Sequence, residues 1–206
     1  MKTALLVVSI LSLVLGACGS KEETKGQAAD PGAKGSDPGA KAKAADPTEE
    51  DPFAFIDFQA LKRTVIQETV DGIAFTVELP EHRLYKKEIK KGDGTFPGYV
   101  TWQLGFRDGP GFTVQPVDFP ASAESLKDGL HGRGQTVTLV EALPDGGLLQ
   151  VVDEDTKKYF QVTVYRKNAA GQGARFSVSE RRRDPIPGYD AEKAWAITVA
   201  KSFTLR

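Results

Sequence analysis

The chain has 206 residues, and 27 Lys and Arg against 28 Asp and Glu give it a formal net charge of −1. This balance excludes the strongly basic composition typical of nucleic-acid-binding domains, so no nucleic-acid partner is expected. A single cysteine excludes a framework of disulfides within the chain. Composition then divides the chain into three parts, residues 1–17, 18–52 and 53–206.

The first part begins with a positive charge at Lys2 and continues as an apolar run of 12 residues, 4–15. Such a run suits the hydrophobic region of an export signal, whereas a helix that spans a bilayer needs roughly 20 residues. The run ends in Leu15-Gly16-Ala17-Cys18. This segment resembles a bacterial lipoprotein signal peptide with its lipobox. The alternative is a plain secretory signal cut elsewhere, which would leave a lone thiol near the start of an exported protein.

The resemblance implies cleavage between Ala17 and Cys18 and acylation of Cys18 by fatty acids such as palmitate. Each acyl methylene buried in lipid contributes about 0.8 kcal/mol, so the two or three chains of this family would hold the protein permanently on a membrane. Gly19 and Ser20 follow, in place of the aspartate that favours inner-membrane retention in Gram-negative relatives. The resemblance therefore implies a lipid-anchored protein of the cell envelope, on the outer membrane.

The second part reads as a spacer. Residues 19–52 contain no Val, Ile, Leu, Met, Phe, Trp or Tyr, and Asp-Pro-Gly-Ala-Lys occurs at residues 30–34 and again at 37–41. Five Lys stand against eight Asp and Glu in this segment. Without apolar side chains a segment cannot offset the entropy lost on ordering, so we predict a disordered linker.

The third part, residues 53–206, holds every aromatic residue and shows apolar alternation of period two, which is typical of strands. Asp71-Gly72 is a strong signal for a two-residue hairpin turn. The predicted strand pairs are residues 64–70 with 73–79, 98–106 with 112–117, 135–143 with 148–152, and 158–166 with 174–182. Helices are predicted over residues 122–130 and 190–201. We expect an α+β domain, a single antiparallel-rich sheet with two helices packed on it.

In the second helix we expect Asp190 to act as the N-cap. The buried face of this helix is predicted to consist of residues that recur close to helical spacing, namely Ala191, Ala194, Trp195, Thr198 and Val199.

Two segments of the domain resemble the PsbP-like fold family. They are Gly72-Ile73-Ala74-Phe75-Thr76-Val77-Glu78-Leu79-Pro80 near its start and Ala200-Lys201-Ser202-Phe203 near its end. The resemblance implies an α+β fold with a terminal helix on the sheet. It implies no activity, because this fold has no common function.

No set of residues with recognisable chemistry occurs. His82 and His131 lack partners at metal-ligand spacing, and Glu81 is expected to point away from His82 on a strand. Asp153-Glu154-Asp155 lacks the spacing of a calcium loop and is interpreted as a hairpin tip. No nucleophile elbow, phosphate loop or dinucleotide fingerprint is present. We therefore expect no catalytic residue, no cofactor and no metal.

Two clusters are basic, Lys86, Lys87, Lys90 and Lys91, and the run Arg181-Arg182-Arg183. A solvated face is the favoured interpretation of each, with an anionic surface as the alternative.

The candidate interaction surface is formed by Arg181, Arg183, Ile186 and Tyr189, because two prolines stiffen this loop. A rigid connector into the last helix is the alternative. The functional hypothesis is a non-catalytic, lipid-anchored domain that binds or assembles with an envelope protein. The alternatives are a small-ligand carrier and an enzyme whose site the sequence does not reveal.

Overall fold

A computed structural model describes residues 56–104, 109–127, 132 and 134–206. All of these residues belong to one compact unit, Thr48–Arg206. Cys18, the cleavage position after Ala17 and the linker lie outside the described residues, so the interpretation of those segments stays a prediction.

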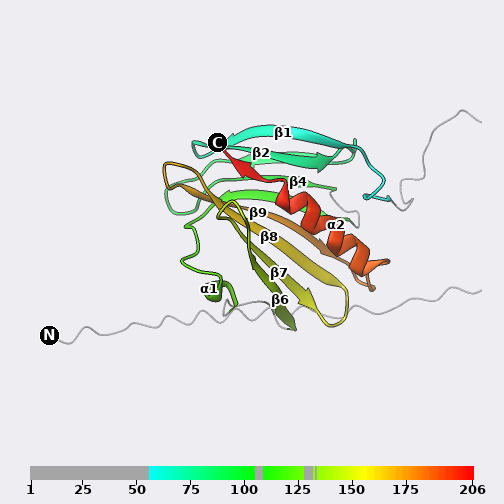
Figure 1. Cartoon of the computed structure of the whole chain (residues 1–206). Coiled ribbons are helices and arrows are strands. Elements are labelled where there is room, and N and C mark those ends of the chain that lie inside the picture. The colour runs from blue at the N-terminus through cyan, green and yellow to red at the C-terminus, as the bar shows by residue number, and fades with distance from the viewer. Residues whose placement is uncertain (1–55, 105–108, 128–131, 133) are drawn as a thin grey trace, which may run out of the picture. The chain divides into compact units, whose positions relative to one another are not determined.

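The described residues form two antiparallel sheets (Figure 1). The smaller sheet has the order β1-β2-β10 and the larger one the order β3-β4-β5-β9-β8-β7-β6. The strands are β1 (Arg63–Val70), β2 (Ile73–Pro80), β3 (Lys86–Lys90), β4 (Tyr99–Gln103), β5 (Gly111–Pro116), β6 (Gln135–Ala142), β7 (Leu148–Glu154), β8 (Tyr159–Lys167), β9 (Gly173–Arg181) and β10 (Thr204–Leu205). The α+β class with antiparallel strands and two helices is confirmed, whereas the prediction of a single sheet is wrong.

Four predicted hairpins are present as β1–β2, β4–β5, β6–β7 and β8–β9. Asp71 and Gly72 make the first turn with φ angles of 45° and 81°. Positive φ at both positions is the type I′ geometry, whose twist matches that of the two strands, and it explains why this dipeptide predicts the hairpin.

A second sheet forms because both edges of β2 are already occupied, one by β1 and the other by β10. The chain after Pro80 turns away and begins β3, which pairs with β4 instead. Strand β3 has no apolar alternation, so its lysines show only as a basic cluster in the sequence. All of β3 is exposed, and the Lys87 ammonium pairs with the Glu68 carboxylate of β1, which links the two sheets.

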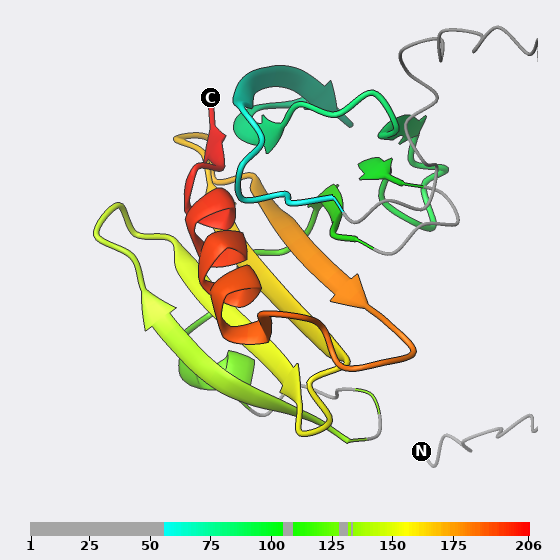
Figure 2. The same cartoon turned by 90° about the vertical axis from the view of Figure 1, so that its right-hand side faces the viewer.

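Helix α2 (Tyr189–Lys201) lies across β8 and β9 and also contacts β2 (Figure 2). The sheet face beneath it carries the alternating side chains of the central strands, including Phe160, Val162 and Val164 of β8. Phe176 of β9 stands 5.6 Å from Phe203 between ring centroids. The hydrophobic core therefore lies between this face, α2 and the smaller sheet.

The face of α2 that packs on the sheet differs from the predicted one. Glu192, Trp195, Ala196, Val199 and Ala200 are buried, and so is Tyr189 at the start of the helix. Ala191, Ala194 and Thr198 are exposed. The N-cap is Gly188 at φ 63°, not Asp190, which lies in the first turn.

Helix α1 (Glu124–Lys127) lies on the other face of the larger sheet, where the Gln150 amide donates to the Leu126 carbonyl at 2.7 Å. It is shorter than the predicted helix over residues 122–130, and residues 128–130 lie outside the described part. At its start, the Ser122 hydroxyl accepts the Ser125 N–H at 3.3 Å. Neither described helix has the length and apolar character needed to cross a membrane.

Candidate functional site

Half of the predicted interaction surface is buried. Ile186 is 3% exposed and Tyr189 is 6% exposed, so neither offers apolar contact to a partner. The Tyr189 hydroxyl lies 3.0 Å from both the Asp153 carboxylate and the Tyr159 carbonyl. Burial and the neighbouring Asp153 carboxylate raise the pKa of Tyr189. The loop is the rigid connector of the alternative interpretation, and this part of the predicted surface is wrong.

The arginines at the end of β9 divide between two faces, as the strand period predicts. Arg181 is exposed, stacks 4.3 Å above the Tyr159 ring and pairs with Glu154 at 3.0 Å. Arg183 is also exposed. Arg182 points inward and pairs with the buried Glu180. The three arginines therefore form no continuous basic patch.

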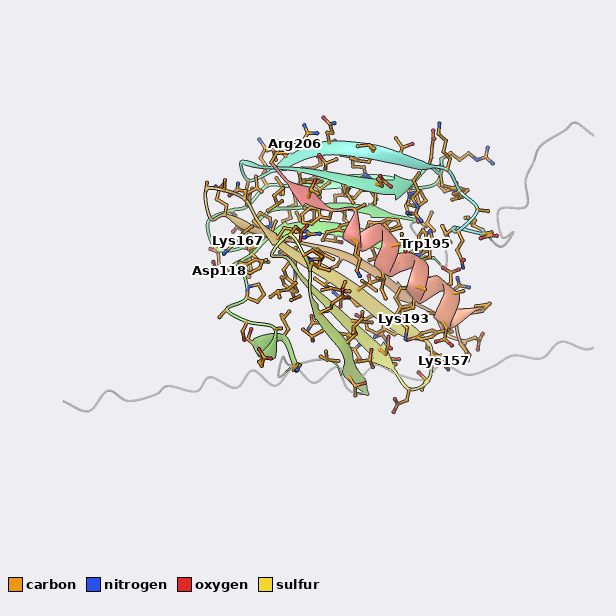
Figure 3. All side chains as sticks on the ribbon, viewed as in Figure 1. Asp118, Lys157, Lys167, Lys193, Trp195 and Arg206 are labelled. Carbon is orange, nitrogen blue, oxygen red and sulfur yellow. The ribbon has the colours of Figure 1, made fainter. Side chains whose placement is uncertain are left out.

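Asp153 lies within β7 and is buried, so its interpretation as part of a hairpin tip is wrong. Its carboxylate accepts from the Thr138 hydroxyl at 2.9 Å and from the Lys193 ammonium at 2.7 Å, in addition to Tyr189. Lys193 and Lys157 lie close to the start of α2, and Trp195 lies farther along it (Figure 3). The hydrogen bonds from Tyr189 and Lys193 to Asp153 therefore connect the start of α2 to β7.

Across the described part of the chain, no three His, Cys, Asp or Glu side chains are placed to hold a metal ion. His82 accepts the Leu84 N–H on its Nδ1 at 3.2 Å. His131 lies outside the described residues. The structure thus gives His82 a local structural role.

The strongest candidate for a binding site is a cavity of about 230 Å³ that is lined from both sheets. Its lining residues are Thr64, Ile66, Leu79, Pro80, Glu81, His82, Tyr85, Trp102 and Phe112. Strands β1 and β2 supply the first four residues, β4 and β5 supply the last two, and the turn after β2 supplies the rest.

The walls of the cavity are aromatic and its rim is polar. Phe112 and Trp102 are buried in the core, and Tyr85 stands 5.3 Å from Phe112 between ring centroids. The Tyr85 hydroxyl donates to the Pro110 carbonyl at 3.1 Å, which fixes the ring. At the rim, the exposed Glu81 carboxylate accepts the Thr64 hydroxyl at 3.2 Å through Oε2.

Two buried carboxylates lie behind Tyr85. Glu180 and Glu192 are 1% and 3% exposed, and both raise the pKa of Tyr85 in addition to the effect of burial. Burial first, and then Glu180, raise the pKa of Glu192 to about 7, against an opposing effect of Arg182. Phe58, near the start of the described chain, packs between Tyr85 and Trp195 at centroid distances of 6.3 and 6.4 Å. Packed aromatic rings therefore lie beside Tyr85 on the core side of the cavity, together with two buried carboxyl groups.

The titratable groups at the cavity are not linked to one another. The titratable side chains at the cavity are Glu81, His82 and Tyr85, and each is engaged by a local partner. Among the described side chains, no hydrogen bond joins any two of these three residues. General acid–base catalysis needs groups within hydrogen-bond reach of a shared reacting atom, whereas a binding cavity needs only apolar walls and a few oriented polar groups.

No local sequence pattern indicates this cavity, because its lining residues come from separate segments between Thr64 and Phe112. Glu81 and His82 were expected to point in opposite directions on a strand. They lie in the turn after β2, and both line the cavity. An available signal was Pro80, whose missing N–H ends the strand and allows neighbouring side chains to converge.

No protein-family model matches the chain. No curated protein matches it either. Among solved structures, the chain is similar to a point mutant of the protein Mog1, at 10% identity and a TM-score of 0.49, over 70% of this chain and 96% of that one. It is also similar to the Saccharomyces cerevisiae Ran-binding protein Mog1p, at 9% identity and a TM-score of 0.47, over 69% of this chain and 96% of that one. Similarity at this level identifies neither a family nor a function for the chain.

Proposed function

We propose that the protein is a lipid-anchored component of the cell envelope, on the outer membrane, whose domain binds an envelope protein without catalysing a reaction. The observation that carries the binding role is the cavity lined from both sheets, with aromatic walls and Glu81 at its rim. The anchor rests on the lipobox that ends at Cys18.

The size of the cavity distinguishes this role from that of a carrier. Pockets that enclose a whole small-molecule ligand typically measure about 300–1,000 Å³. A cavity of about 230 Å³ is better suited to one side chain or one small group of a larger partner. As regards the enzyme alternative, the titratable groups at the cavity, Glu81, His82 and Tyr85, form no hydrogen bond with one another among the described side chains.

We further propose that the fold is PsbP-like, on the two segments that carry this resemblance. The segments contact one another, since the ring centroids of Phe75 and Phe203 lie 6.0 Å apart. In addition, the Ser202 hydroxyl accepts the Glu78 N–H at 3.0 Å. A shared structural role of this kind supports the resemblance without adding a function to it.

Cys18→Ala is expected to abolish incorporation of labelled palmitate into the full-length chain, because it removes the thiol that acylation requires. Ser20→Ala, two residues away, is the matched control and should be labelled like the wild type. Equal labelling of wild type and Cys18→Ala would contradict the anchor.

A photo-crosslinking residue at Thr64, at the rim of the cavity, should capture a specific protein when the full-length chain is expressed in its own host. The same residue at Ala170, an exposed position at the tip of the β8–β9 hairpin, is the control. Gel electrophoresis after irradiation would show a discrete adduct for Thr64 alone. Identical adducts at both positions, or none at either, would contradict a binding role for the cavity.

A further inference from the structure

We propose that the cavity accepts an alkylammonium group, specifically a lysine side chain of the protein partner. Its ammonium would lie at Glu81, and its methylenes would lie against Trp102 and Tyr85. This inference rests on the proposed binding function and specifies the chemistry that the cavity recognises.

The first argument is charge. Glu81 is the only Asp or Glu among the residues that line the cavity, and none of those residues is Lys or Arg. The Thr64 hydroxyl orients the carboxylate through Oε2, and Oε1 has no hydrogen-bond partner among the described residues. An oriented carboxylate with a free oxygen accepts strongly from a cationic N–H group.

The second argument is the surroundings of this carboxylate. Lys87 of β3 is paired with Glu68 of β1. Behind the Tyr85 ring lie the buried Glu180 and Glu192, and Arg182 pairs with the first of these. Glu192 Oε2 has no hydrogen-bond partner among the described residues. The interior therefore adds no net positive charge at the cavity, because the Arg182 guanidinium is balanced by the Glu180 carboxylate.

The third argument is the chemical character of the side chains that line the cavity. Tryptophan and tyrosine rings attract cations through their electron-rich faces, and both also cover the methylenes of a long side chain. Trp102 and Tyr85 supply these two rings, and Ile66 and Leu79 complete the apolar surface. An apolar stem with a terminal positive charge satisfies both the walls and the rim.

Indole N–H resonances provide a direct test on the full-length lipoprotein in detergent micelles. The chain has two tryptophans. Trp102 lines the cavity, and Trp195 does not, so its resonance serves as an internal reference. The probes are N-acetyl-lysine amide, its neutral analogue N-acetyl-norleucine amide, and n-butylamine. The lysine probe should shift the Trp102 resonance saturably, and the norleucine probe should bind at least about tenfold more weakly.

Glu81→Gln should weaken binding of the lysine probe by about tenfold and leave binding of the norleucine probe unchanged. Glu78→Gln is the matched control, because Glu78 is an exposed carboxylate on β2 that does not line the cavity. It should bind the lysine probe like the wild type.

Three results would overturn the inference. Equal binding of the lysine and norleucine probes would show a neutral apolar site, and the proposed binding function would still stand. Absence of any Trp102 shift would reject the ligand class, and crosslinking at Thr64 would then decide the binding function separately. Tighter binding of n-butylamine than of the lysine probe would reject a protein side chain as the source of the amine.

Discussion

Trp195→Ala is expected to lower the free energy of unfolding by about 3–5 kcal/mol, a large share of the roughly 5–15 kcal/mol that stabilises a domain. Trp195 is 7% exposed and lies at the centre of the buried face of α2. Its ring stands 6.4 Å from both Phe58 and Phe112. Truncation would leave a cavity among these rings that the sheet cannot collapse to fill. Chemical denaturation of the full chain measures the loss.

Thr198→Ala is the matched control on the same helix. Thr198 is exposed, and its hydroxyl donates only to the Ala194 carbonyl one turn earlier, at 3.1 Å. The free energy of unfolding should change by less than about 0.5 kcal/mol. Equally small effects of both substitutions would contradict the packing of α2 on the sheet. Lys193 is unsuitable as a control, because its ammonium bonds to the buried Asp153.

The sequence predicts local pairing in this fold better than it predicts the pairing of distant strands. Asp71-Gly72 requires positive φ at two successive residues, and this requirement determines the hairpin and its register. The division into two sheets depends instead on which strand takes the free edge of β2. That strand is β10, a two-residue strand at the far end of the chain, which is too short to show a period.

The face of α2 that packs on the sheet is likewise determined by contacts with distant parts of the chain. Ala191 and Ala194 are as small as Ala196 and Ala200, so the positions of the alanines do not show which side meets the sheet. The deciding contacts come from elsewhere in the chain, because Asp153 bonds to Tyr189 and Lys193 near the start of the helix. The polar Glu192 is consequently buried, which a hydrophobic pattern does not predict.

The candidate site was still less predictable than the fold. Its residues extend from Thr64 to Phe112 and come together only when the two sheets pack. Trp102 is a buried residue of the core, and a core residue can also form the wall of a cavity. For Ile186 and Tyr189 the opposite holds. A loop with two prolines suggests that its apolar side chains are exposed, but these two side chains are buried in the core.

The burial of Glu192 predicts a pH-dependent component of stability. Its carboxyl group is buried, and its Oε2 lacks a hydrogen-bond partner among the described residues. Burial and the neighbouring Glu180 and Asp57 raise its pKa from 4.5 to about 7, and Arg182 opposes them. A carboxyl group with a raised pKa binds its proton more tightly in the folded state. This component of stability is therefore fully present below pH 4.5, falls as the pH rises toward 7 and is constant above that.

The expected loss is on the order of 3 kcal/mol between these limits, because each pKa unit corresponds to about 1.4 kcal/mol. Glu192→Gln carries no titrating proton at this position and should remove the loss. The difference in free energy of unfolding between the variant and the wild type should therefore favour the variant more at pH 8 than at pH 5. Glu78→Gln, at an exposed position, should follow the wild type at both values. Denaturation curves of the three full-length chains measure these differences, and the histidine contributions cancel between them. Parallel pH responses of wild type and Glu192→Gln would mean that the pKa of Glu192 is the same in the folded and unfolded protein, with Arg182 offsetting the effect of burial.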